Sequence, residues 1–251
     1  FNMGTAGVAI PTLFSRIIAA VWILCLLWNK NRKLYLFRQI QLHIDWSIIR
    51  KILRVGVPYG IENGTFFLGR ILVLGMIASL GTIAITSNAV AGTLSNLQVI
   101  PGMAVAFGTT VVIARCVGAG DFEQAKYYNR KIICIVYLSQ FITCMAVSML
   151  LPQIMHIYGL SVETSRLVEQ IMWMHTLFTV FIWPLSYILP ATFRATGDAR
   201  YPMIIGLLSL FAGRLFCSWL LGIHLQIGIF GVWLGMFADW CIKAFCFILH
   251  Y

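Results

Sequence analysis

Ionisable side chains inside long apolar runs are the residues of this sequence best suited to chemistry. A charge is costly in an apolar interior, so a carboxylate, guanidinium or imidazole found there is a functional candidate by default. Such residues interrupt the apolar runs at Arg16, Glu62, Arg70, His175, Arg214, Asp239 and Lys243. The simplest chemistry that this set offers is a buried carboxylate that binds and releases a proton or Na⁺, or that attracts an organic cation.

Glu62 is the strongest of these candidates because it lies well inside its apolar run. In a helix that begins near residue 53, it lies roughly 13 Å from that end. A carboxylate at this depth is suited to bind a coupling ion, H⁺ or Na⁺. The structural alternative is an ion pair with Arg70, roughly 12 Å further along the same helix, or with a residue outside this chain.

The other ionisable residues divide into pairs and single side chains. Asp239 and Lys243 are spaced i, i+4, which places them on one helix face and favours a mutual ion pair. His175 lies near one end of its run, where it either titrates in contact with outside water or packs as a structural side chain. Arg16 and Arg214 are expected to bind backbone carbonyls or to extend towards the interface.

Polar amides are weaker candidates for the same site. We expect Asn63 and Asn88 to line a cavity. Amides such as Gln98 either do the same or hold neighbouring helices together. Prolines at positions 58, 101, 184 and 190 predict bends within the runs. No metal site is expected, because the 7 cysteines contain no CxxC pair and neither they nor the 5 histidines show metal-ligand spacing.

The elements that must hold these residues are helices that cross a membrane. The composition is 60% hydrophobic and 10% charged, whereas soluble domains carry about 25% charged residues. The apolar runs are long enough to cross a bilayer, about 20 residues each, and they lack the period-two alternation of barrel strands. We predict an all-α membrane protein with seven transmembrane helices, near residues 4–28, 53–80, 86–114, 131–155, 168–193, 202–222 and 227–249.

Lys and Arg gather in every second connection, and this predicts the topology. The stretches 29–54, 115–131 and 193–201 hold most of the 18 Lys and Arg residues, whereas the alternate connections hold only Arg166. Basic connections face the cytoplasm. Residue 1 is therefore expected on the outer side of a cell membrane, and the C-terminus on the cytoplasmic side. The net charge of +10 thus reflects membrane topology, and nucleic acid is not an expected partner. The expected partner is the lipid bilayer.

A weak internal echo predicts the domain organisation. Three residues recur at the start of the last span: Gly4, Gly7 and Val8 match Gly228, Gly231 and Val232. The offset equals six spans, which is typical of a duplicated six-helix unit in a transporter. We therefore expect residues 1–28 to be the last helix of an N-terminal lobe. Residues 29–52 are then a cytoplasmic basic inter-lobe linker, and residues 53–251 a C-terminal six-helix lobe.

Three segments carry a resemblance to a known family: "GTAGVAIPTLFSR" from Gly4, "GAGDFEQAKYYNRK" from Gly118 and "RATGDARYP" from Arg194. The last two predict tight turns, in which Asp121 caps the helix that follows. Together the segments resemble the MATE family of multidrug and toxic compound extrusion proteins. The resemblance implies a twelve-helix, two-lobe transporter, of which this chain is helix six plus the second lobe.

The resemblance also implies a function and a partner. It implies a cation-coupled antiporter, driven by H⁺ or Na⁺, that exports drugs or organic cations through a cavity shared with a missing N-terminal lobe. It implies no cofactor. A functional acidic residue is common in the helix that holds Glu62. It often lies two turns after the proline, whereas Glu62 lies one turn after Pro58 and Phe66 occupies the later position.

Two other functions remain open at this point. A lipid-linked oligosaccharide or polysaccharide flippase of the same superfamily is expected to line its cavity with several basic residues, and Arg70 is a candidate for this role. A seven-helix receptor also agrees with the number of spans. A membrane-embedded enzyme would need clustered His and Asp side chains, and the 5 histidines form no such cluster, so we expect no enzymatic activity.

Overall fold

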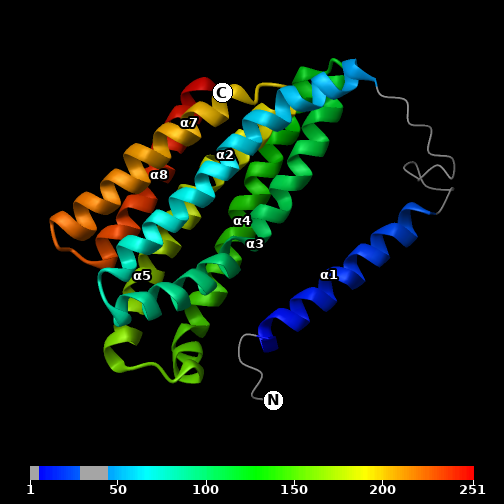
Figure 1. The fold of residues 1–251 in the computed structure, drawn as a ribbon. Coiled ribbons are helices and arrows are strands. Elements are labelled where there is room, and N and C mark those ends of the chain that lie inside the picture. The colour runs from blue at the N-terminus through cyan, green and yellow to red at the C-terminus, as the bar shows by residue number, and fades with distance from the viewer. Residues whose placement is uncertain (1–5, 29–44) are drawn as a thin grey trace. The chain divides into compact units, whose positions relative to one another are not determined.

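The computed structural model describes residues 6–28 and 45–251. The chain divides into two units, residues 1–46 and 47–251, and each is described by itself. The described residues are helical apart from short turns, and they include no strand (Figure 1). Gly4 and positions 29–44 of the predicted linker lie outside the described residues.

The described part of the first unit is the helix α1 (Ala6–Leu27). Its sequence is apolar apart from Arg16, and it is long enough to cross a membrane. Arg16 is exposed on this helix. The predicted span at residues 4–28 is therefore confirmed as a helix over its described part.

The second unit is a bundle of long helices joined by short turns. The helices are α2 (Trp46–Ala78), α3 (Thr82–Gly118), α4 (Phe122–Tyr158), α5 (Val162–Phe181), α6 (Trp183–Ala195), α7 (Arg200–Ser209) and α8 (Ile229–His250). Beyond Ser209, α7 continues as two π-helical segments, η1 (Leu210–Cys217) and η2 (Trp219–His224).

The prediction of seven spans agrees with these helices on one condition. Six helices of the described chain, α1 included, are long and apolar enough to cross a membrane. A seventh span results if α5 and α6 are taken together, although the two are bent by 44° at Ile182. The bend coincides with Pro184, which lacks the N–H that would continue the helical ladder. The predicted span over 168–193 is therefore present as a bent pair of helices, and the bend predicted at Pro184 is confirmed.

Most of the helices extend beyond the apolar runs that predicted them. α2 begins at Trp46, inside the stretch assigned to the linker. α3 and α4 have 37 residues each, which is roughly 55 Å of helix against about 30 Å of hydrocarbon. Hydropathy identifies only the part of a helix that lies in lipid, so the charged ends were not predicted, apart from the start of α4 that the Asp121 cap indicated.

The two predicted turns have the expected geometry. Gly120 has a φ of 77°, and Asp121 caps α4 by accepting a hydrogen bond from the backbone N–H of Gln124 at 2.8 Å. Gly197 has a φ of 94°, and Asp198 accepts from the N–H of Tyr201 at 3.2 Å. Both glycines adopt the left-handed backbone that favours this residue type.

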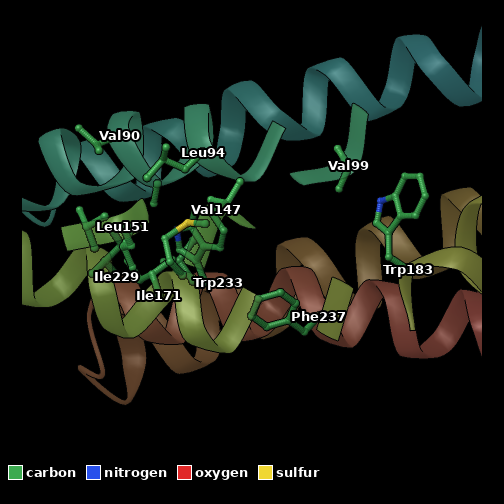
Figure 2. Close-up of a cluster of buried hydrophobic side chains, with 14 of the residues drawn as sticks. Val90, Leu94, Val99, Val147, Leu151, Ile171, Trp183, Ile229, Trp233 and Phe237 are labelled. Atoms are coloured by element: carbon green, nitrogen blue, oxygen red, sulfur yellow. The ribbon is translucent and has the colours of Figure 1, made fainter. Parts of the chain in front are cut away.

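The core of the second unit lies among α3, α4, α5, α6 and α8. Figure 2 shows Leu94, Val147, Ile171 and Phe237 among its buried side chains. Trp183, next to the α5–α6 bend, is buried in the same cluster. These five helices pack against one another through this core. We call them the scaffold, because the candidate residues are positioned against them.

α2 is bound to this scaffold much less tightly. Of its 33 residues, only Gly69 and Ile77 are buried. The same helix contains glycines at 56, 60 and 64, and a Cβ added at any of them would meet nothing within 4 Å. Much of the α2 surface is therefore uncovered in the structure.

α7 with its π-helical extension lies directly against α8 (Figure 1). A Cβ at Gly213 would lie 2.6 Å from the backbone nitrogen of Asp239, and one at Gly231 would lie 2.6 Å from the carbonyl carbon of Leu221. Ser218 also donates a hydrogen bond to the carbonyl of Val232 at 2.9 Å. Glycine is required at these positions because the two backbones touch.

Candidate functional site

Glu62 forms an ion pair with Arg194, from α6. Their closest atoms, Oε2 of Glu62 and Nη1 of Arg194, are 3.0 Å apart. The Arg194 guanidinium also covers the ring of Tyr59, with 4.7 Å between Cζ and the ring centroid. The side chains of Glu62 and Arg194 are 20% and 18% exposed, so the pair lies partly at the surface of the second unit.

The structural alternative for Glu62 named Arg70 as its partner, and that pairing was wrong. Arg70 is exposed on α2, and within the described part of the chain the carboxylate of Glu62 binds Arg194 instead. Spacing along one helix could not indicate this partner, because Arg194 is 132 residues away in sequence. The site therefore joins α2 to the end of α6.

Glu62 also touches α7. A Cβ built on Gly206 would lie 3.2 Å from Cγ of Glu62, so the carboxylate-bearing side chain lies over a glycine that leaves room for it. One turn further along α2, the Phe66 ring lies against Arg214 of η1 and Lys243 of α8. Glu62 and Phe66 thus share the face of α2 that is directed towards the scaffold.

Among the described residues, neither Asn63 nor Asn88 forms a hydrogen bond with Glu62. The Asn63 amide donates to the carbonyl of Tyr59 on its own helix at 3.0 Å. Asn88 is half-buried on α3. Their role in lining a cavity stays a prediction.

Asp239 and Lys243 form the ion pair that their spacing predicted, so that expectation is confirmed. Nζ of Lys243 lies 3.0 Å from Oδ1 of Asp239 and donates to Oδ2 at 3.3 Å. Arg214 joins the same carboxylate, with Nη2 3.1 Å from Oδ2 and Nε donating to Oδ2 at 3.3 Å. The expectation that Arg214 binds backbone carbonyls or extends to the interface was wrong, because its partner comes from the neighbouring helix.

These three residues form a buried cluster, which we call the α7–α8 triad (Arg214, Asp239 and Lys243). Their side chains are 9%, 0% and 10% exposed. The triad contains two cations and one anion, so it carries one excess positive charge. The Phe66 ring covers both cations, at 4.9 Å from Cζ of Arg214 and 5.7 Å from Nζ of Lys243.

His175 is packed into the core, as the structural interpretation proposed. It is 2% exposed, and Nδ1 lies 2.6 Å from Oε1 of Gln98 and 3.1 Å from Oγ1 of Thr179. The rings of Trp233 and Trp240 meet its imidazole edge to face. Contact with outside water is therefore excluded for this side chain in this conformation.

An amide network around His175 joins α3, α4 and α5. Gln98 donates to Oγ1 of Thr176 at 2.8 Å, and Gln140 donates to the backbone carbonyl of Gln98 at 2.9 Å. Ser148 lies 3.2 Å from the Thr176 hydroxyl. Gln98 thus holds helices together, which is one of the two roles predicted for it. Gln140 and Ser148 gave no signal in the sequence, because isolated polar residues in apolar runs are common.

The described residues include no group of three or more His, Cys, Asp or Glu side chains that could hold a metal ion. Five of the seven ionisable candidates lie in three separate places, the Glu62–Arg194 pair, the α7–α8 triad and the His175 network, whereas Arg16 and Arg70 are exposed. The Glu62–Arg194 pair is the most exposed of the three.

Comparison with known proteins agrees with this architecture. A family model described as MatE matches residues 58–219. The "Uncharacterized transporter YisQ" of Bacillus subtilis (strain 168) is 26% identical over 247 residues, which are 96% of this chain and 53% of that protein. The "Probable multidrug resistance protein NorM" of Thermotoga maritima is 26% identical over 242 residues, which are 95% of this chain and 51% of that protein.

Solved structures show the same fold. The "Crystal structure of MATE in complex with MaL6" has a TM-score of 0.85 at 18% identity, over 99% of this chain and 56% of that one. The "Outward-facing conformation of a multidrug resistance MATE family transporter of the MOP superfamily" has a TM-score of 0.84 at 19% identity, over 99% and 55%. The chain spans about half the length of the curated relatives it matches. Because the family model covers more than half of the sequence, the chain belongs to the MatE family of transporters.

Proposed function

We propose that this chain supplies the second lobe, and the helix before it, of a cation-coupled antiporter that exports drugs or organic cations. Membership of the MatE family supports transport, and several relatives are described as probable multidrug resistance proteins. The chain is about half as long as these relatives, so the proposal includes an N-terminal lobe that completes the substrate cavity. In this proposal the protein is a transporter and not an enzyme, and the coupling ion is H⁺ or Na⁺.

The observation that carries the coupling role is the Glu62–Arg194 pair. It joins α2, which has little buried surface, to α6, which belongs to the scaffold. A proton that binds the Glu62 carboxylate removes its charge, and Na⁺ competes with the guanidinium for the same oxygens. Either ion weakens the pair, and Arg194 retains Tyr59 and water as partners.

This competition gives the ion a mechanical effect. With the pair formed, α2 is held to the end of α6 and to α7 near Gly206. With the pair broken, α2 is held mainly by apolar contacts around Gly69 and Ile77. A transporter of this kind alternates between two arrangements of helices around a central site, and ion binding at Glu62 would favour one of them.

The first prediction is that Glu62→Gln abolishes ion-driven efflux in a complete two-lobe transporter that contains this chain. Glutamine keeps the size and hydrogen bonding of the side chain but cannot titrate. Because both partners are partly exposed, the loss of this pair costs only about 1 kcal/mol of stability or less, and expression should stay normal. Efflux of a fluorescent substrate under an imposed H⁺ or Na⁺ gradient is the measurement.

Two further variants separate coupling from folding. Glu169→Gln removes an exposed carboxylate from α5 and should leave efflux unchanged. Glu62→Gln with Arg194→Gln removes both partners: if Glu62 couples, this protein folds but still does not respond to the gradient. Recovery of gradient-driven efflux in the double variant would show that the pair is only structural.

The expectation of cationic substrates and the flippase alternative both stay predictions. Arg70, the basic residue once considered for a flippase, is exposed on α2.

A further inference from the structure

The α7–α8 triad leaves one buried positive charge without an anionic partner. Arg214 and Lys243 share the single carboxylate of Asp239, and their side chains are 9% and 10% exposed. A charge at such a depth in a membrane-spanning helix is expensive unless it is paired, and it is usually retained for function. Within the described residues, the triad includes only this one acidic side chain.

The excess charge is covered by an aromatic ring instead. Phe66 lies over both cations, at 4.9 Å from Arg214 and 5.7 Å from Lys243. A ring face attracts a cation weakly compared with an anionic oxygen, which accepts short charge-assisted hydrogen bonds. Arg214 has five N–H donors and Lys243 has three, and Asp239 cannot use all of them. Donors therefore remain for a second acceptor.

The helix that carries Phe66 is the one least fixed to the scaffold. Only two residues of α2 are buried, whereas α7 and α8, which carry the cations, touch through their backbones at Gly213 and Gly231. The cations are therefore held in place, and their cover belongs to the loosely packed helix. Displacement of Phe66 exposes the donors without disturbing Asp239.

We propose that Arg214 and Lys243 form a binding site for an anionic group, a carboxylate or phosphate carried by an amphiphilic molecule, which replaces the ring of Phe66. The planar guanidinium suits two oxygens of such a group, and the ammonium adds a third donor. One bound negative charge makes the cluster neutral. The Phe66 ring that this group would replace is apolar, and its place suits the hydrocarbon part of such a ligand.

This inference goes beyond the proposed function and does not depend on it, because coupling at Glu62 needs no anion. It extends the ligand class of the lobe to molecules with a negative group, such as zwitterionic drugs or lipids. Binding is measured without transport, so failure of one proposal leaves the other standing.

The experiment uses the full chain in phosphatidylcholine nanodiscs with radiolabelled hexyl phosphate as the probe. Equilibrium dialysis against empty nanodiscs subtracts partition into lipid, and hexyltrimethylammonium is the probe of opposite charge. We expect saturable binding of one hexyl phosphate per chain and no saturable binding of the cation. Equal uptake of both probes, or uptake equal to that of empty nanodiscs, would overturn the site.

Variants locate the binding within the chain. Lys243→Gln removes the excess charge, keeps a donor for Asp239 and should weaken hexyl phosphate binding by at least about tenfold. Arg115→Gln removes the same charge from an exposed position on α3 and should not change it. Phe66→Leu removes the competing ring and should tighten binding several-fold. If Lys243→Gln does not fold, Phe66→Leu decides the matter, because unchanged affinity there contradicts a ring that competes with the ligand.

A second arm distinguishes the two sources of such an anion. When half of the phosphatidylcholine is replaced with phosphatidylglycerol, loss of hexyl phosphate binding shows that a lipid headgroup occupies the site. Retained binding shows that the site prefers a soluble anion. Lys243→Gln must weaken whichever ligand is bound, and failure to do so in both lipids refutes the proposal.

Discussion

At the scale of single residues, Asp239 is the residue on which the buried charges depend. It is completely buried, and it contacts Arg214 through Oδ2 and Lys243 through both oxygens. Removal of one cation leaves a neutral pair, whereas removal of the anion leaves two like charges side by side. Loss of Asp239 should therefore lower the stability of the fold more than loss of either cation.

The second prediction concerns this inequality. Asp239→Asn should destabilise the chain by about 3–5 kcal/mol, the range seen when a buried ion pair loses one partner. Lys243→Gln should cost clearly less, because Arg214 still neutralises the carboxylate. Thermal unfolding in detergent, followed by intrinsic fluorescence, measures both. An Asp239→Asn protein as stable as the parent would contradict this account of the triad.

The sequence predicted residue partners only where they lie on one helix. Asp239 and Lys243 are four residues apart, and helical geometry alone brings them together. Glu62 and Arg194 are joined by the packing of α2 on α6, and Arg214 reaches Asp239 from another helix. Charge within an apolar run thus identified every member of these pairs except Arg194, which was assigned to a basic connection, and two of the three ion pairs required the fold.

At the scale of elements, the contact between η2 and the start of α8 depends on glycine. The Cβ that alanine would add at Gly231 lies 2.6 Å from the carbonyl carbon of Leu221 and 2.7 Å from the nitrogen of Gly222. Both are backbone atoms, which cannot rotate away as a side chain can. The two helices would have to separate to accept even one methyl group.

The third prediction is that Gly231→Ala destabilises the chain by about 1–3 kcal/mol or more, through overpacking. Gly108→Ala is the matched control, because Gly108 lies within α3 and its added Cβ would meet nothing within 4 Å. Alanine is the better helix former by about 1 kcal/mol, so the control should be neutral or slightly stabilising. Equal thermal stabilities of the two variants would show that the backbone contact carries no weight.

Periodicity and hydropathy predicted that the helices exist, but not how they deviate from ideal helices. Pro184 was correctly expected to bend its run, and it separates α5 from α6. Pro58, Pro101 and Pro190 lie inside single helices. Proline marks a weak point in the hydrogen-bond ladder, and packing decides whether the helix breaks there.

At the scale of the whole second unit, the described basic segments around Arg54, the α3–α4 turn and Arg200 gather at one end. The turn between α3 and α4 packs near Ala195 at the end of α6. Arg54 of α2 and Arg200 of α7 line one shallow pocket of about 310 Å³. His250, at the end of α8, stacks on Tyr201 with 3.9 Å between ring centroids. This arrangement supports the predicted topology, in which that end faces the cytoplasm.

The fourth prediction tests this topology in a cysteine-free version of the chain. A cysteine at Lys126 should react with an impermeant maleimide in inside-out vesicles and remain unlabelled in intact cells. A cysteine at Thr82, which begins α3 at its other end, should show the opposite pattern. Labelling of Lys126→Cys from outside would reverse the orientation of the lobe.

The π-helical segment of α7 determines which way Arg214 points. In such a segment each N–H bonds to the carbonyl five residues back instead of four, so each turn holds an extra residue. Arg214 lies within this stretch, at Leu210–Cys217. One residue of an α-helix corresponds to a rotation of roughly 100°. Had the segment kept α-helical bonding, the guanidinium would face a different neighbour. The residue types therefore set the charge of the triad. The π-helical hydrogen bonding of the backbone sets the direction in which Arg214 points, and so brings it into contact with Asp239.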